Sequence, residues 1–171
     1  MTQRQVLRRL ADLLVALDRP HPIRVAIDGI DAAGKTTLGD ALAPLIRRRG
    51  RPVIRASVDG FHRPRADRYR RGAHSPEGYL QDAFDYPALR AALLDPLGPG
   101  GDLRYRRVAF DFRLDAPVIA PLQAAQPNAV LLLDGVFLLR SELADAWDFR
   151  IFVDVPFEEA LRRACLRDAA H

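Results

Sequence analysis

Apolar positions follow two spacings along this chain, and together they predict alternating helices and buried strands. Helical spacing predicts one helix over residues 6–17 and another that begins at Lys35 and ends at Gly50. Short, near-continuous apolar runs predict buried strands at residues 23–28, 53–58, 129–133 and 149–155. Strands that are apolar on both sides are covered on both faces, so the pattern predicts an α/β fold, a three-layer sandwich with a central parallel sheet.

The stretch between the second and third predicted strands is the least regular part of the chain. Ser75 followed by Pro76 predicts the start of a helix, which residues 84–87 interrupt before it resumes over residues 87–94. Residues 103–119 predict a short β-ribbon or an extended arm. The remaining apolar spacing predicts helices over residues 141–147 and 157–170, and a kink or a loosened turn at Pro44.

Length and composition suit one domain. The chain has 171 residues, of which 49% are hydrophobic, so we expect residues 1–22 to form an N-terminal helix and linker and residues 23–171 to form the core. No apolar run approaches the roughly 20 residues that span a bilayer, so we expect a cytoplasmic protein without a membrane partner. Cys165 is the only cysteine, which excludes an intrachain disulfide.

The net charge of +4 is concentrated in part between residues 61 and 75, where five arginines accompany a single acid, Asp67. A local basic cluster favours a small anionic nucleotide over a long polymer, and no nucleic-acid-binding motif is evident, so we expect no nucleic-acid partner. The alternative for each of these arginines is a solvated loop position.

Residues 29–36 read Gly-x-x-x-x-Gly-Lys-Thr and lie between a predicted strand and a predicted helix, the context of a P-loop. Glycines let backbone N–H groups turn toward phosphate oxygens. Lys35 is the only lysine among 26 basic residues, and its compact ammonium suits the β- and γ-phosphates of ATP. The Thr36 hydroxyl is the expected ligand for Mg²⁺. The predicted nucleotide-binding residues are Gly29, Ile30, Asp31, Ala32, Ala33, Gly34, Lys35, Thr36 and Thr37.

Two aspartates follow predicted strands at the edge where α/β sheets bind ligands. Asp134 is a candidate Mg²⁺ ligand, and Asp59 is a candidate base for an attacking hydroxyl or a Mg²⁺ ligand through water. Either could instead be a turn aspartate before glycine. His62 is a candidate substrate-binding residue. Arg163 and Arg167 share one face of the last predicted helix, where they could stabilise the transferring phosphoryl group.

The order and spacing of these segments resemble the uridine kinase family, within the wider group that includes phosphoribulokinase and pantothenate kinase. The matching segments are residues 29–37, 59–62, 84–87, 110–112, 133–137 and 163–168. The resemblance implies ATP-dependent phosphorylation of a primary hydroxyl, the 5′-hydroxyl in the nucleoside case. It also implies that Asp59 is the general base, that Asp85 binds ribose hydroxyls beside Phe84, and that the two arginines belong to a lid.

The departures from the family lie where the acceptor is recognised. Asp134 stands where uridine kinases usually carry Glu, and Phe110, a candidate substrate contact, stands where Tyr is common. Asp115 falls near the position of a pyrimidine-reading His. The base-reading residues are therefore the weakest match to the family. The resemblance still puts uridine or cytidine first as the acceptor, with pantothenate, a sugar or a nucleoside monophosphate such as dTMP as alternatives. A P-loop hydrolase or switch is the alternative from another class.

Two further features of the sequence are a second similarity of the glycine loop and the number of predicted strands. The glycine loop is also similar to that of thymidylate kinase, but the Asp67-Arg68-Tyr69 triplet lies in a loop rather than at a strand end, so we interpret it as a coincidence. A P-loop kinase core has five parallel strands, whereas four are predicted here. We therefore expect the core to be incomplete at its C-terminus, without the last strand and part of the lid. Partners would be a nucleotide and a small hydroxyl acceptor, and a homo-oligomer stays open.

Overall fold

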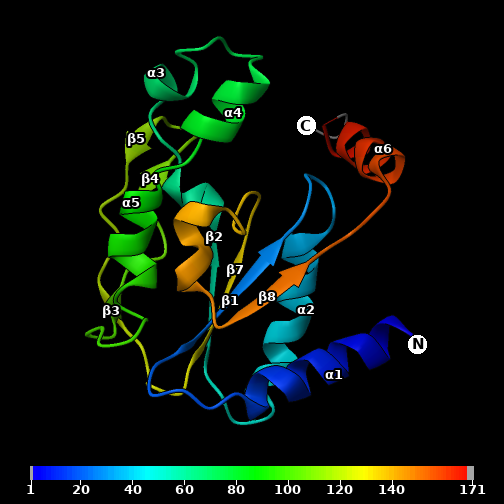
Figure 1. Ribbon diagram of the computed structural model, residues 1–171, viewed down its shortest axis with the longest axis vertical. Coiled ribbons are helices and arrows are strands. Elements are labelled where there is room, and N and C mark those ends of the chain that lie inside the picture. The colour runs from blue at the N-terminus through cyan, green and yellow to red at the C-terminus, as the bar shows by residue number, and fades with distance from the viewer. Residues whose placement is uncertain (1, 169–171) are drawn as a thin grey trace.

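The computed structural model describes residues 2–168, with side chains for residues 2–166, around a four-stranded parallel sheet (Figure 1). The strand order is β2-β7-β1-β8, with bounds Val53–Ser57, Val130–Asp134, Ile23–Asp28 and Phe149–Phe152. Asp134 stands opposite Ile27 of β1 and Ser57 of β2 in the register of the sheet. The carboxyl ends of three strands thus meet at one edge, and the predicted α/β fold with a parallel sheet is confirmed.

Helices cover both faces of this sheet. On one face, α1 (Gln3–Ala16) and α2 (Lys35–Arg47) pack against Val25, Ile27 and Leu132. On the other face, alternate strand residues such as Ala26 and Leu133 meet α5 (Tyr86–Leu89), the π-helical turn η2 (Arg90–Leu94) and the 3₁₀ helix η3 (Ser141–Ala146). Because successive residues of a strand point to opposite faces, apolar residues at every position bury both faces.

Several element ends differ from the predicted ones. Strand β2 stops at Ser57, because Val58 begins the 3₁₀ helix η1 (Val58–Phe61), and β8 stops at Phe152 rather than at residue 155. Pro44 remains inside α2, which continues to Arg47, and Gly50 follows with a left-handed φ of 87°. The predicted helix over residues 141–147 is 3₁₀-helical, and α6 (Phe157–Asp168) is the last described element.

Short elements fill the irregular stretch. They are α3 (Arg65–Arg68), α4 (Pro76–Asp82) and two antiparallel pairs, β3 (Arg104–Tyr105) with β6 (Gln123–Ala124) and β4 (Phe110–Asp111) with β5 (Ala116–Pro117). Ser75 caps α4 as predicted, since its Oγ accepts the N–H of Gly78 at 3.0 Å. Arg70 and Arg71 both donate to the buried Asp82, at 2.7 and 2.8 Å. The arginine-rich stretch is therefore partly fixed by ion pairs.

No helix in the described part of the chain has the length and apolar character needed to cross a membrane.

Candidate functional site

The glycine loop connects the end of β1 to the start of α2, and its backbone has an unusual shape. Gly29, Ala32 and Gly34 have positive φ angles of 149°, 57° and 95°. A Cβ atom on Gly29 would lie 2.6 Å from the carbonyl oxygen of Val153, so a larger residue does not fit. Such a bend can turn successive N–H groups toward one anion, and the N-terminus of α2 adds its partial positive charge.

Lys35 lies within this loop and is nearly buried, with 8% of its surface exposed. Its Nζ donates hydrogen bonds to the carbonyl oxygens of Gly29 at 3.0 Å and Ile30 at 2.7 Å. Burial lowers the pKa of Lys35, and this effect is opposed by nearby aspartates, first of all Asp31. The ammonium is thereby held at the mouth of the loop, where a phosphate chain would pass.

Asp134 is held from two sides. The Thr36 Oγ1 donates to Asp134 Oδ2 at 2.7 Å, and the Arg55 Nη2 donates to Asp134 Oδ1 at 2.8 Å. Arg55 is fixed in turn by the carbonyl of Leu132 at 2.7 Å and by Asp40 at 3.1 Å. The Asp134 side chain is only 5% exposed, so the guanidinium compensates a charge that would otherwise be buried alone.

The hydroxyl of Thr36 and the carboxylate of Asp134 fit a magnesium ion. Both are hard oxygen donors, and Mg²⁺ usually combines one or two protein oxygens with substrate phosphates and water. The described residues contain no group of three or more His, Cys, Asp or Glu side chains that could hold a metal. The other ligands of a bound magnesium ion would therefore be phosphate oxygens of the nucleotide and water, as in nucleotide kinases.

Asp59 lies in η1, directly after β2. Its side chain is exposed to solvent, yet desolvation by the surrounding protein raises its pKa, partly offset by the charge of His62 when protonated. The Nδ1 of His62 lies 2.9 Å from the Asp59 carbonyl oxygen. Because a carbonyl only accepts, Nδ1 carries the proton. Burial lowers the pKa of His62, whose ring lies 4.6 Å from Phe84 and 4.7 Å from Phe112 between centroids.

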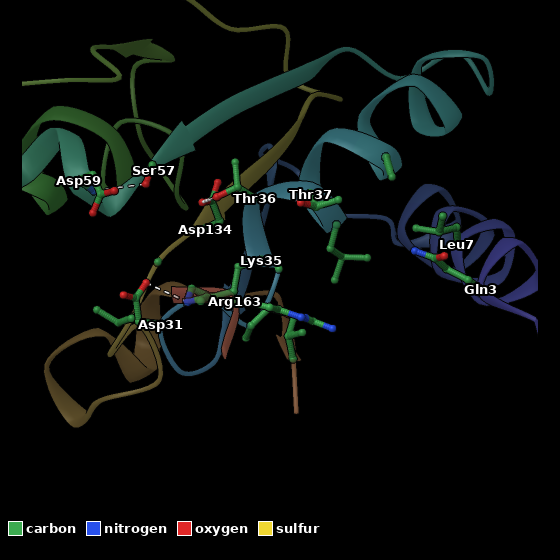
Figure 2. Close-up of a pocket in the computed structure, with 18 of the residues that line it drawn as sticks. Gln3, Leu7, Asp31, Lys35, Thr36, Thr37, Ser57, Asp59, Asp134 and Arg163 are labelled. Atoms are coloured by element: carbon green, nitrogen blue, oxygen red, sulfur yellow. Dashed lines mark hydrogen bonds between the residues drawn. The ribbon is translucent and has the colours of Figure 1, made fainter. Parts of the chain in front are cut away.

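A single open cavity of about 750 Å³ joins these parts (Figure 2). Asp59 and Ser57 lie at one end, and Thr36 and Asp134 lie in the middle beside the glycine loop. Arg163, on α6, lines the same cavity and its Nη1 lies 3.4 Å from the carbonyl oxygen of Ala33. The structure thus brings residues 31–37 of the predicted phosphate-binding loop and the predicted base into one space, whereas Gly29 and Ile30 line a separate cavity of about 510 Å³.

Other predicted residues lie elsewhere. Phe84 and Phe110 are buried, and Asp85 caps α5 by accepting the N–H of Ala88 at 2.9 Å. These three residues do not line the large cavity, and His62 lines a smaller cavity of about 330 Å³ beside it. Arg167 follows Arg163 by one turn of α6, but its side chain lies outside the described part of the chain. The substrate-binding roles of these residues stay predictions.

Some lining residues had no role in the sequence-based prediction. Arg55 is a charged residue within an apolar run, which is a usable signal for a buried ion pair. Tyr79, which lines both cavities, and Gln3 and Leu7 of α1 carried no such signal. Their place depends on how α1 and α4 pack against the rest of the protein, which local patterns do not encode.

Comparisons with known proteins point to kinases. No family model matches the chain. The chain is 28% identical over 148 residues to a uridine kinase of Chlamydia pneumoniae, covering 84% of this chain and 63% of that protein. It is also 28% identical over 148 residues to a pantothenate kinase of Mycobacterium sp. (strain KMS), covering 83% of this chain and 46% of that protein. The chain therefore spans less than two thirds of the length of these relatives.

Two solved structures share the fold of this chain. A possible uridine kinase from Bacillus stearothermophilus has a TM-score of 0.77 at 23% identity, with 99% of this chain and 91% of that chain covered. A "putative fructose transport system kinase" from Silicibacter sp. TM1040 has a TM-score of 0.77 at 27% identity, with 100% and 83% covered. The shared architecture extends over the whole of this chain.

Proposed function

We propose that this chain, which belongs to the uridine kinase-like group of P-loop kinases, transfers the γ-phosphate of ATP to a primary hydroxyl of a small molecule. One observation carries the proposal. A carboxylate with a raised pKa, Asp59, opens into the same cavity as the glycine loop, Lys35 and the Thr36–Asp134 pair. A donor of phosphate and a hydroxyl to be activated can therefore meet in one space.

The phosphate side would work by positioning and charge. The backbone of the glycine loop and Lys35 would bind the β- and γ-phosphates, with Lys35 giving up its hydrogen bonds to the Gly29 and Ile30 carbonyls. Thr36 and Asp134 would hold Mg²⁺, which when bound neutralises charge on the phosphates. Arg163, already at the mouth of the loop, would stabilise the transferring group.

The acceptor side would work through Asp59. A carboxylate within hydrogen-bond reach of a hydroxyl can orient it and accept its proton as the oxygen attacks phosphorus. Desolvation raises the pKa of Asp59 and makes it a stronger base than an ordinary aspartate. His62, whose Nδ1–H is occupied by the Asp59 carbonyl, presents Nε2 for a further contact with the acceptor.

Uridine or cytidine is the acceptor we put first, on the resemblance to uridine kinases and on the relative of that name. Pantothenate follows, supported by the relatives named pantothenate kinase. Asp115, which falls near the position of the pyrimidine-reading His in uridine kinases, does not support recognition of a pyrimidine at this position. Its Oδ1 accepts the N–H of Arg65 at 2.7 Å and lies 3.3 Å from Arg68 Nη2, so it serves the arginine-rich stretch.

A screen for ADP release tests the proposal. The 171-residue chain is incubated with MgATP and each of a panel of nucleosides, pantothenate, sugars and nucleoside monophosphates. We expect ADP release that requires one acceptor and that falls by about 10²-fold in Asp59→Asn. ADP release that proceeds equally without any acceptor would instead establish a hydrolase and refute the proposed transfer.

A further inference from the structure

The large cavity continues past the phosphate-binding residues. Its end remote from Asp59 is formed by two helices, with the lining residues Gln3 and Leu7 of α1 and Thr37, Leu38 and Ala41 of α2. Figure 2 shows the order along the cavity: Asp59 and Ser57 first, then Thr36 with Asp134, then Thr37, and finally Leu7 and Gln3. This end contains no acidic side chain among the described lining residues.

Helix α1 is firmly fixed in this place. Ala11 and Leu14 are fully buried against α2 and the sheet. Arg51 donates to the carbonyls of Leu14 at 3.2 Å and Leu17 at 2.8 Å, and so holds the C-terminal end of the helix. The first two turns of α1 thereby line the same cavity as the first turns of α2, the helix whose N-terminus would bind the phosphates.

The direction of the phosphate chain follows from the two ends of the cavity. The γ-phosphate must face the acceptor hydroxyl at Asp59, and Lys35 serves the β- and γ-phosphates. The α-phosphate and the nucleoside then extend the other way, past Thr37. Resting on the proposed function, we propose that α1 and α2 form the nucleoside pocket of the phosphate donor, with Gln3 selecting adenine.

The chemistry of the lining side chains fits a nucleoside. Leu7, Leu38 and Ala41 are half-buried apolar groups that could pack against the flat face of a base or against ribose. Gln3 is exposed, and its side-chain amide makes no hydrogen bond within the described part of the chain. An amide offers one donor and one acceptor side by side, which matches the N6–H and N7 edge of adenine and mismatches the corresponding N7 and O6 edge of guanine, where both atoms are acceptors.

The test compares ligands with and without a nucleoside. Binding of ATP, GTP and inorganic tripolyphosphate, each with Mg²⁺, is measured by calorimetry for the unmodified chain and for Leu7→Ala, Gln3→Ala and Leu13→Ala. We expect Leu7→Ala to weaken ATP about fivefold while tripolyphosphate is unchanged. Gln3→Ala should remove an ATP-over-GTP preference of about tenfold. Leu13 lies on α1 with 48% exposure and outside the cavity, so its truncation should change neither.

The ratio of ATP affinity to tripolyphosphate affinity distinguishes the proposed nucleoside pocket from the proposed phosphate site. Equal affinities in the unmodified chain, or equal losses for both ligands in Leu7→Ala, would overturn the nucleoside pocket and leave the phosphate site standing. Absence of binding by all three ligands would overturn the phosphate site and the pocket together. Gln3→Ala alters an exposed position, so the outcome for adenine selectivity does not depend on the fold tolerating the loss of Leu7.

Discussion

Two regions of the molecule hold their key carboxylates in opposite ways. The first, proposed to bind phosphate and here called the phosphate-binding region, is residues 28–37 with Asp134; the second, proposed to bind the acceptor and here called the acceptor-side region, is residues 57–124. Asp134 is nearly buried and has a partner on each oxygen, Arg55 on one and Thr36 on the other. Asp59 is exposed to the cavity and forms no ion pair within the described residues. One carboxylate is held by a partner on each oxygen, while the other opens into the cavity and has a pKa that desolvation raises.

The difference is reflected in the pKa of Asp59. Desolvation raises that pKa, so the charged carboxylate is less favourable in the folded protein than in the unfolded chain. A group of this kind lowers stability at neutral pH, a cost that is common at functional sites. The charge of Asp134, by contrast, is compensated by the guanidinium of Arg55 and by a hydrogen bond from Thr36. The proposed metal-binding carboxylate is thus held by two partners, whereas the proposed base has no ion-pair partner among the described residues.

Lys35→Ala gives the largest expected effect and tests the phosphate-binding region. Removing the chain's only lysine side chain should lower turnover by about 10²-fold or more, because Lys35 is the compact cation at the loop mouth. The measurement is ADP release at saturating acceptor. Lys35→Arg is the matched control, and we expect it not to restore turnover, since a planar guanidinium does not fit the site of a compact ammonium. Turnover within a few fold of the unmodified chain would remove Lys35 from the mechanism.

Asp59→Asn tests the acceptor-side region. It should lower turnover by about 10²-fold with ATP affinity nearly unchanged, because the amide cannot accept the proton. It should also raise Tm at pH 7. The folded-state pKa of Asp59 is raised, so the cost of its charge is present above that pKa and absent below the unfolded value of about 3.9. The gain in Tm should therefore disappear as pH falls toward about 4.

The control for this prediction is Asp67→Asn. Asp67 is an exposed aspartate of the same region, and it belongs to the Asp67-Arg68-Tyr69 triplet that we interpret as a coincidence. We expect its turnover and its Tm to match those of the unmodified chain at both pH values. A loss of turnover in Asp67→Asn as large as that in Asp59→Asn would give the triplet a role and weaken the assignment of the base.

The sequence allowed the phosphate-binding region to be predicted better than the acceptor side, for a physical reason. Residues 29–37 are a continuous segment that forms a loop and the start of α2, and Asp134 ends an apolar strand, so local patterns are sufficient there. Phe84 and Phe110 are aromatic residues of a kind that often lines substrate pockets, but here both are buried. Whether such a phenylalanine lines a pocket or is buried in the core depends on how distant segments pack. The partner of Asp134, Arg55, comes from a neighbouring strand and is likewise set by packing.

Gly39→Ala gives the smallest expected effect and sharpens the contrast from the Asp134 side. A Cβ atom on Gly39 would lie 2.6 to 2.9 Å from three guanidinium atoms of Arg55. The side chain would have to shift, which weakens its bond to Asp134. In an unobstructed helix this change stabilises by about 1 kcal/mol, so a fall in Tm of a few degrees would reveal the obstruction. A rise in Tm would show instead that Arg55 moves without cost.

The double variant Gly39→Ala with Arg55→Met completes this test. With the guanidinium removed, the added methyl group meets no obstruction, so alanine at position 39 should no longer lower Tm relative to Arg55→Met alone. An equal loss in both backgrounds would place the cost in the helix rather than in the contact. The coupling between the two positions measures how strongly the protein holds Asp134 in place. We expect no counterpart at Asp59, for which the described residues form no ion pair that could be displaced.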